Sequence, residues 1–311
     1  MVKIAVIGVG GWGKNHLRVL YELGVLSAFC DADQSRVESF QEKYRVKGYT
    51  TVDELLSKEN LDGVAVCTPT STHYEIAEKT IARGLHTFVE KPLTASSNDG
   101  EKLIEQAEKQ KVKLTVGYIE RFNPAVTELK SMLRSGKLGE PLLLEFHREN
   151  KWPTRIKDVG IIADTAVHDI DTARWIFEAE PKIVFARAGQ VLSQNEDFAA
   201  IILGFDDKKN AFITSNWVTP KRVRQLITVC TEGIATIDFV TQNITIDDSE
   251  GSQSPRRVWQ EPLKKELEGF VECIARDVQP LVTGRDAVNT TKIAEAALVS
   301  SRSGSPIYLD I

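Results

Sequence analysis

Three separated groups of residues carry features from which an active site could be built. Gly8–Gly13 reads GVGGWG, a glycine-rich run that fits the pattern GxGxxG. Glu90-Lys91-Pro92 closes an apolar segment further along the chain, and Asp164 is followed four positions later by His168. A phosphate-binding loop, a lysine cation and a carboxylate–imidazole pair are the parts that hydride transfer from an alcohol requires. We therefore predict a dehydrogenase.

The glycine run is the predicted dinucleotide site. Its glycines permit a tight turn, a close approach of the backbone to a pyrophosphate, and close helix packing. The run follows an apolar strand and opens a helix, whose N-terminus stabilises phosphate charge. Asp31, at the end of the next strand, can accept hydrogen bonds from ribose hydroxyls and would repel a 2′-phosphate, which favours NAD over NADP. The alternatives are a purely structural glycine turn, and a capping role for Asp31, followed by Asp33, at the helix near Gln34.

Lys91 follows a predicted strand end at the carboxyl edge of a parallel sheet. Open α/β folds bind their ligands at this edge. An EKP tripeptide alone is more often a solvated turn. Pro92 would make the turn rigid and allows a cis peptide, which would fix the direction of Lys91.

Asp164 and His168 are predicted to lie on one face of a helix near residues 158–177, because residues four apart are neighbours on a helix surface. Asp171 adds a third polar member to that face. An ordinary solvated face is the alternative interpretation. The helix can pack through a separate apolar stripe, which consists of Ala166, Ile170, Ala173 and Phe177.

Residues 147–155, HRENKWPTR, form a locally basic stretch just before that helix. Its cations could hold an acidic or phosphorylated substrate, and a solvated loop is the equal alternative. Three other histidines, His16, His73 and His86, lie near the starts of predicted helices or strands. We expect each of them to pack or to cap.

The first part of the chain alternates short apolar strands with helices, which predicts a doubly wound parallel sheet, an α/β Rossmann domain. We place helices after the glycine run and near residues 74–84 and 98–109. The predicted strands are Lys3–Gly8, Leu26–Cys30, Leu61–Thr68, Leu85–Glu90 and Lys113–Tyr118.

From Pro141 onward, strand-like segments follow one another with polar turns, which predicts an antiparallel sheet. Fewer helices are expected there, one near residues 158–177 and one near 262–277. We therefore predict two domains, a Rossmann domain at 1–121 and an α+β substrate-binding and oligomerisation domain at 122–311.

Composition excludes several classes of protein. A net charge of -5 and a pI near 5.7 provide no broad cationic surface for nucleic acid. The four cysteines, Cys30, Cys67, Cys230 and Cys273, are too widely spaced for a zinc site or a disulfide framework, so we predict reduced thiols and no metal. Without a signal-peptide pattern or a membrane-spanning run, a cytoplasmic protein with no membrane partner is expected.

GVGGWG, Asp31, CTPTSTH at 67–73, EKP and the Asp164–His168 pair together resemble the Gfo/Idh/MocA oxidoreductase family over essentially the whole chain. The resemblance implies a Rossmann domain joined to an α+β domain with a large open antiparallel sheet, in a homodimer or homotetramer. It implies that Lys91 and His168 flank the substrate carbon that faces the nicotinamide, with Asp164 as third catalytic member. The NAD contacts that it implies are Gly8, Gly10, Gly11, Trp12, Gly13, Asp31, Thr68, Pro69, His73, Glu90 and Lys91.

Residues 116–125, VGYIERFNPA, have a narrower resemblance, to sugar-nucleotide 3-dehydrogenases acting on UDP-N-acetylglucosamine or its uronic acid. This implies hydride transfer from C3 of a nucleotide sugar. Dehydrogenation of free inositol, glucose or another sugar is the alternative, and a non-catalytic NAD-binding regulator is a third, which the three catalytic residues argue against. The implied substrate contacts are Lys91, Arg121, Asn123, Lys151, Arg155, Asp164 and His168.

Overall fold

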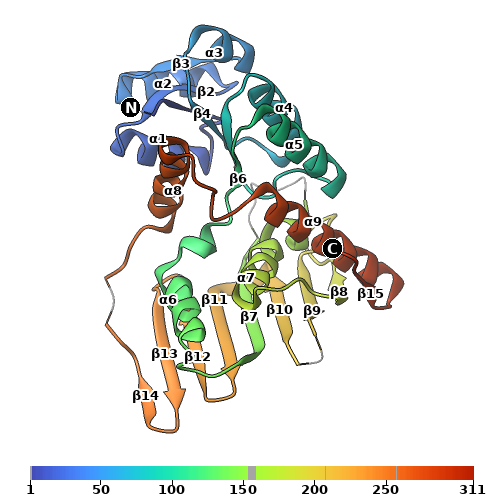
Figure 1. The fold of residues 1–311 in the computed structure, drawn as a ribbon. Coiled ribbons are helices and arrows are strands. Elements are labelled where there is room, and N and C mark those ends of the chain that lie inside the picture. Colours follow the sequence, from blue (N-terminus) through green and yellow to red (C-terminus); the bar gives the residue numbers. More distant parts are fainter. Residues whose placement is uncertain (1, 153–158, 207, 257) are drawn as a thin grey trace. The chain divides into compact units, whose positions relative to one another are not determined.

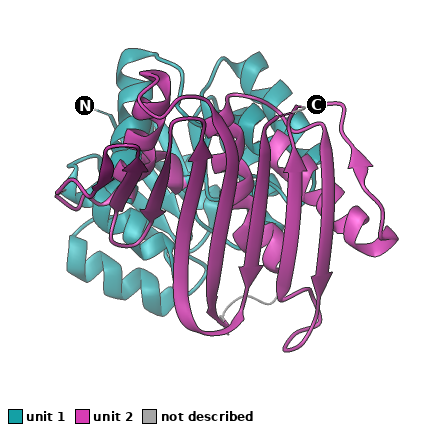
Figure 2. Ribbon diagram, turned by 90° about the horizontal axis from the view of Figure 1, so that it is seen from below, with its two compact units in different colours: residues 1–118, 263–288 teal, residues 119–262, 289–311 magenta. Residues whose placement is uncertain are grey.

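The structure is a computed structural model, and it describes residues 2–152, 159–206, 208–256 and 258–311. It contains two compact units, each built around one β-sheet (Figure 2). Unit 1 comprises residues 1–118 and 263–288, and unit 2 comprises residues 119–262 and 289–311. The predicted domain boundary between residues 121 and 122 lies close to residue 118, where the chain first passes from unit 1 to unit 2. Residues 263–288, however, belong to unit 1 and not to the second domain as predicted.

Unit 1 contains a six-stranded sheet in the order β3-β2-β1-β4-β5-β6, with every pair parallel. This confirms the predicted Rossmann domain (Figure 1). The strand order reverses between β1 and β4, the point at which such sheets bind ligands. The strands are β1 (Ile4–Ile7), β2 (Leu26–Cys30), β3 (Lys47–Tyr49), β4 (Gly63–Val66), β5 (His86–Val89) and β6 (Leu114–Val116).

Helices connect these strands, and three of them begin at a capping side chain. Asp33 accepts hydrogen bonds from the backbone N–H groups of Ser35 and Arg36 at the start of α2. Thr51 caps α3 and Ser96 caps α5 in the same way. The helices are α1 (Gly13–Glu22), α2 (Gln34–Tyr44), α3 (Val52–Lys58), the 3₁₀ turn η1 (Thr70–Thr72), α4 (His73–Ala82) and α5 (Ser97–Gln110).

Residues 262–303 add two helices, α8 (Pro262–Arg276) and α9 (Gly284–Ser303), of which α8 and the first turn of α9 belong to unit 1. Phe270 of α8 packs on Phe88 of β5, with ring centroids 5.8 Å apart. The Thr115 hydroxyl of β6 donates to the carbonyl oxygen of Val282 at 2.7 Å. The helix predicted near residues 262–277 is therefore present, but it covers the sheet of unit 1.

Unit 2 contains a nine-stranded sheet in the order β14-β13-β12-β11-β7-β10-β9-β8-β15 (Figure 2). The β7–β10 pair is parallel and the other pairs are antiparallel, so the predicted large sheet is confirmed with one parallel exception. The strands are β7 (Pro141–Lys151), β8 (Ile183–Gly189), β9 (Phe198–Gly204), β10 (Asn210–Asn216), β11 (Val218–Cys230), β12 (Gly233–Asp238), β13 (Asn243–Asp248), β14 (Gly251–Gln253) and β15 (Ile307–Tyr308).

The two faces of this sheet differ in burial. Side chains alternate along each strand, and on one face Phe146, Ile213 and Leu226 are fully buried beneath α6 (Pro124–Arg134) and α7 (Val167–Phe177). On the other face Phe198 and Ile202 are exposed. None of the helices within the described residues is both long and apolar enough to cross a membrane.

Candidate active site

The glycine loop joins β1 to α1, and two of its glycines are required by packing. Gly8 has a φ of +87°, and a Cβ there would lie 2.9 Å from the backbone of Cys67. A Cβ at Gly13 would lie 1.9 Å from the Gly8 carbonyl oxygen. Gly10 and Gly11 are different, because a Cβ at Gly10 would meet only Arg36 at 3.5 Å and one at Gly11 would meet nothing within 4 Å. The loop is therefore tightly packed beneath and open above.

A cavity of about 450 Å³ lies over the open part of the loop. The N-terminus of α1 next to it has no side-chain cap and no acidic residue in its first turn. Its backbone N–H groups and dipole can therefore stabilise an anion such as a pyrophosphate. The cavity is lined by Val9, Gly10, Gly11, Lys14, Ser35, Arg36, Ser39 and Phe40.

Asp31 is fixed at the end of β2, beside this loop. Its carboxylate accepts hydrogen bonds from the backbone N–H of Val9 at 2.8 Å and of Asp33 at 3.0 Å. The Arg36 guanidinium lies 3.0 Å from it. Because Asp33 caps α2, the capping alternative for Asp31 is wrong. Sequence reasoning missed Arg36, although its place in the first turn after Asp31 was a signal that it faces the same cavity.

Glu90 connects the glycine loop to the EKP turn. Its carboxylate accepts hydrogen bonds from Trp12 Nε1 at 2.8 Å and from the Lys91 backbone N–H at 3.1 Å, and lies 2.6 Å from His16 Nε2. Burial raises the pKa of Glu90, but the hydrogen bond and charge of His16, with Lys91 and Trp12, outweigh burial and lower that pKa. The Lys91–Pro92 peptide is cis. His16 thus has a polar partner in the site and is more than a packing residue.

His73 occupies a buried position under the same turn. Its Nδ1 lies 2.8 Å from the Pro92 carbonyl oxygen and its Nε2 lies 2.9 Å from the Thr68 carbonyl oxygen. Burial lowers the pKa of His73, although both carbonyl groups favour the protonated ring. Both ring nitrogens are therefore engaged with the backbone, and His73 connects the start of α4 to Thr68 and to the EKP turn. Thr68 is half-buried and Pro69 is exposed at this edge.

In unit 2, Asp164 and His168 lie on different kinds of helical turn. Asp164 belongs to a π-helical segment, η3 (Ile162–Ala166), and His168 belongs to the first turn of α7. Asp164 accepts a hydrogen bond from the Thr165 hydroxyl at 2.9 Å, and the His168 carbonyl accepts one from the Thr172 hydroxyl at 2.8 Å. Both residues are half-buried. The predicted regular helix is therefore wrong in its first part, and π turns of this kind recur at functional sites.

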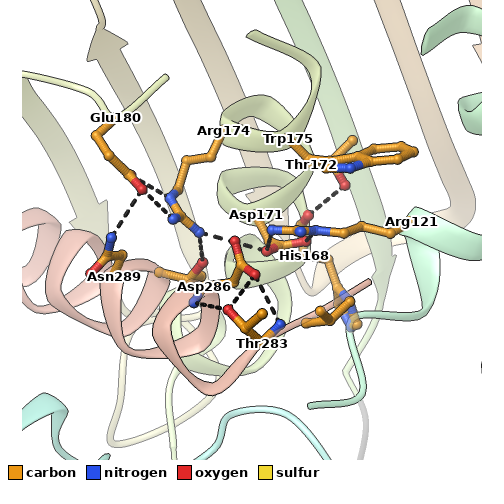
Figure 3. A network of polar contacts seen from close by, with 12 residues as sticks. Arg121, His168, Asp171, Thr172, Arg174, Trp175, Glu180, Thr283, Asp286 and Asn289 are labelled. Atoms are coloured by element: carbon orange, nitrogen blue, oxygen red, sulfur yellow. Dashed lines mark hydrogen bonds and ion pairs between the residues drawn. The ribbon is translucent and has the colours of Figure 1, made fainter. Parts of the chain in front are cut away.

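Asp171 does not share an accessible face with Asp164 and His168. It is 1% exposed and accepts hydrogen bonds from Arg121 Nε and Nη2 at 2.8 and 2.7 Å (Figure 3). Arg174, one turn later, donates to the Thr290 hydroxyl at 2.9 Å and pairs with Glu180. Asp171 is thus part of a buried network, and the prediction of one polar face with three members is wrong.

The Arg121 guanidinium is itself buried in that network, against the Asp171 carboxylate. Asn123 is also buried, where it caps α6 and donates to the Phe239 carbonyl oxygen at 3.0 Å. Glu120 accepts from Arg148 at 3.0 Å. The segment that carries the narrower resemblance is therefore a structural junction, and neither Arg121 nor Asn123 presents an unoccupied side chain. Lys151 is exposed at the end of β7, and Arg155 lies outside the described residues.

Arg148 and Asp169 form a second buried ion pair beneath the sheet. Arg148 Nη2 lies 2.7 Å from the Asp169 carboxylate, and Arg148 Nη1 lies 3.0 Å from that of Glu120. Burial alone would lower the pKa of Arg148, but the two carboxylates raise it. In the described part of the chain, no group of three or more His, Cys, Asp or Glu side chains is placed to hold a metal ion.

Two family models match the chain. The model of an oxidoreductase family with an NAD-binding Rossmann fold, Gfo/Idh/MocA, matches residues 2–118, and that of the GFO/IDH/MocA C-terminal domain matches residues 126–236. The chain belongs to the Gfo/Idh/MocA family. Its first domain is therefore an NAD-binding domain, which agrees with the open glycine loop, the uncapped α1 and Asp31.

Individual relatives include enzymes with different substrates. The chain is 28% identical to the UDP-N-acetylglucosamine 3-dehydrogenase of Acidithiobacillus ferrooxidans over 79% of this chain and 76% of that protein. It is 29% identical to the scyllo-inositol 2-dehydrogenase (NAD(+)) of Bacillus subtilis over 100% of this chain and 97% of that protein. Among solved structures, the UDP-N-acetylglucosamine 3-dehydrogenase GnnA from A. ferrooxidans matches with a TM-score of 0.90 and 25% identity, covering 97% of this chain and 98% of that chain.

Proposed function

We propose that this protein oxidises a secondary hydroxyl of a nucleotide sugar with NAD⁺, at C3 of a UDP-N-acetylhexosamine. The observation that carries the proposal is the similarity to a UDP-N-acetylglucosamine 3-dehydrogenase, which extends over nearly the whole of both chains in structure. The ERFNP segment, which forms the Glu120–Arg148 and Arg121–Asp171 junction of unit 2, is the sequence feature that agrees with it.

The residues proposed for the chemistry are Lys91, Asp164 and His168. Bound NAD⁺ supplies the hydride acceptor. His168 takes the proton of the substrate hydroxyl, since an imidazole titrates near neutral pH. The Lys91 ammonium stabilises the negative charge that develops on the same oxygen. Asp164 positions the imidazole or holds a neighbouring hydroxyl.

Dehydrogenation of free inositol is the second candidate, because the scyllo-inositol enzyme is as similar over the full length of the chain. The same three residues would serve it. The two candidates differ in whether the substrate carries a diphosphate, so they can be separated by the substrate alone. A non-catalytic regulator is the third candidate and predicts NAD binding without turnover.

The test is the absorbance of NADH at 340 nm when purified protein and NAD⁺ are mixed with UDP-N-acetylglucosamine, its uronic acid, UDP-glucose, glucose or myo-inositol. Addition of 2-oxoglutarate in parallel would recycle a retained cofactor. Product from the UDP sugars alone supports the proposal, and oxidation at C3 is then checked on the isolated ketosugar. Activity confined to free polyols would overturn it in favour of the second candidate, and silence with measured NAD binding would favour the third.

Variants test the assigned roles. Lys91→Met and His168→Ala should each lower kcat at least a hundredfold, because general acid–base catalysis contributes about 10²–10⁴-fold, while NAD affinity changes little. Lys102→Met is the matched control, since Lys102 is an exposed lysine of the same unit that pairs with Asp99. Normal turnover in either active-site variant would show that the roles are wrongly assigned.

We further propose that the exposed face of the nine-stranded sheet joins two copies of the chain. The strand register aligns Phe185, Ile202 and Phe212 across β8, β9 and β10 on this face. A row of apolar side chains in water favours burial against a partner. Light scattering after gel filtration should give a homodimer or homotetramer, and Ile202→Lys should shift it toward monomer. A monomeric wild-type protein would exclude this role for the face.

A further inference from the structure

The end of the β7–β11 pair carries a group of cations on unit 2. Lys151 pairs with Val218, and Arg224 pairs with Arg148, but the register shifts between Val218 and Val223. The intervening residues of β11 bulge out of the ladder and include the exposed Lys221 and Arg222. Lys151, Lys221, Arg222 and Arg224 therefore gather at one end of two neighbouring strands.

Arg224 differs from Arg148 and Arg121 in its partners. Directly opposite residues of an antiparallel pair point to the same face of the sheet, so Arg224 lies beside Arg148 on the face covered by helices. Arg148 forms ion pairs with both nearby carboxylates, those of Asp169 and Glu120. Within the described residues, no carboxylate forms an ion pair with Arg224. Burial, together with the charge of Arg148, lowers the pKa of Arg224 to about 10, against the weaker opposing effect of Glu120.

A partly buried cation beside a second arginine is costly for the fold unless an anion meets it. The guanidinium group is planar and presents paired donors that match a phosphate. Arg224 is also close to the proposed catalytic helix, because Asp169, which follows His168 in α7, pairs with the strand neighbour of Arg224. These observations indicate an anion site in the same part of unit 2 as His168.

We propose that Arg224 binds the diphosphate of the nucleotide-sugar substrate, with Arg222 at the rim of the same site. This inference rests on the proposed function, since a free sugar carries no such group. Arg121, which the narrower resemblance implies as a substrate contact, pairs with Asp171.

The experiment measures binding of UDP by calorimetry to the full chain saturated with NAD⁺, so that UDP does not enter the cofactor cavity. Arg224→Gln should weaken UDP binding at least tenfold, and Arg224→Lys should weaken it less because the charge is kept. Arg302→Gln, an exposed arginine at the end of α9, is the control and should bind UDP as the wild type does. Unchanged UDP binding by Arg224→Gln, or no binding by the wild type, would overturn the proposal.

Thermal unfolding separates a ligand-binding arginine from a structural one. Arg224→Gln removes a positive charge from beside Arg148, so its unfolding temperature should equal or exceed that of the wild type. A clear drop, or failure to fold, would mark Arg224 as structural and overturn the proposal. Arg224-dependent UDP binding without oxidation of any UDP sugar would support this site and refute the proposed function. Oxidation of UDP-N-acetylglucosamine with an unchanged KM in Arg224→Gln would do the reverse.

Discussion

Single methyl groups added to the glycine loop should separate folding from cofactor binding. Gly13→Ala places a methyl carbon 1.9 Å from the Gly8 carbonyl oxygen, where real contacts begin near 3.0 Å, so the backbone must shift by about 1 Å. Overpacking of this kind costs about 3 kcal/mol or more. The unfolding temperature of unit 1 should fall by roughly 6–12 °C, at about 2–4 °C for each kcal/mol.

Gly10→Ala should have the opposite signature. Its methyl group meets only Arg36, at 3.5 Å, so the stability should change by less than about 0.5 kcal/mol. Gly10 lines the cavity, however, and the methyl group would occupy the path of the pyrophosphate. We expect the Kd for NAD⁺ to rise at least tenfold, which corresponds to about 1.4 kcal/mol.

Gly11→Ala is the control, because the added methyl group meets nothing within 4 Å and the GxGxxG pattern accepts any residue at this position. Its unfolding temperature should match or slightly exceed that of the wild type, so Gly11→Ala is a control for stability alone, because Gly11 also lines the cavity. Scanning calorimetry and titration calorimetry measure the two quantities on the same samples. Wild-type NAD⁺ affinity in Gly10→Ala would refute the placement of the pyrophosphate over this glycine.

Three further predictions concern charge and burial. Asp31→Ser should relax the preference for NAD over NADP by at least tenfold in the ratio of Kd values, because Arg36 would lose one of its two carboxylate partners and could meet a 2′-phosphate. Glu90→Gln should cost about 1–3 kcal/mol at pH 7, against less than about 0.5 for the exposed Glu75→Gln. The pKa of Glu90 is lowered from 4.5 in the folded protein, so its contribution to the free energy of unfolding is complete above pH 4.5 and is lost as the pH falls below it. The free energy of unfolding, measured with denaturant at a series of pH values, should therefore fall less steeply on the acid side in Glu90→Gln than in the wild type. Burial raises the pKa of Cys30 to about 12 and that of Cys230 to about 11, so a disulfide reagent at pH 8 should label them slowly until the protein is unfolded.

The strands of unit 1 could be predicted from the sequence because both faces of the sheet are covered. Residues such as Ile4–Ile7 and Gly63–Val66 are buried throughout, and they read as continuous short apolar runs. Helix α6 was missed although Asn123 and Pro124 are an N-cap and a first-turn proline, which was a usable signal. Helix α9 has no such pattern, because its buried positions include Thr290 and Ser300 as well as alanines, which hides the helical period.

The glycine loop, Asp31 and Lys91 could be placed from the sequence because each follows a strand in a fold with a fixed edge for ligands. The partners of the arginines could not. Arg148 meets Asp169, and Arg121 meets Asp171, through contacts between a strand or turn and a helix far along the chain. A basic residue in a sequence is a candidate for substrate binding until the fold shows which carboxylate it already has.

The two proposed anion sites share one feature, each within its own unit. Helices α2, α3 and α5 of unit 1 have side-chain caps and α4 has Glu75 in its first turn, whereas α1 has neither. Among the described residues of unit 2, Arg121 and Arg148 each pair with a carboxylate, whereas Arg224 pairs with none. Charges and helix dipoles that the protein pairs internally are not available to a ligand. An external anion therefore binds most strongly where the described residues provide no such partner. We expect a phosphate of the cofactor to bind at the N-terminus of α1 and a phosphate of the substrate to bind Arg224.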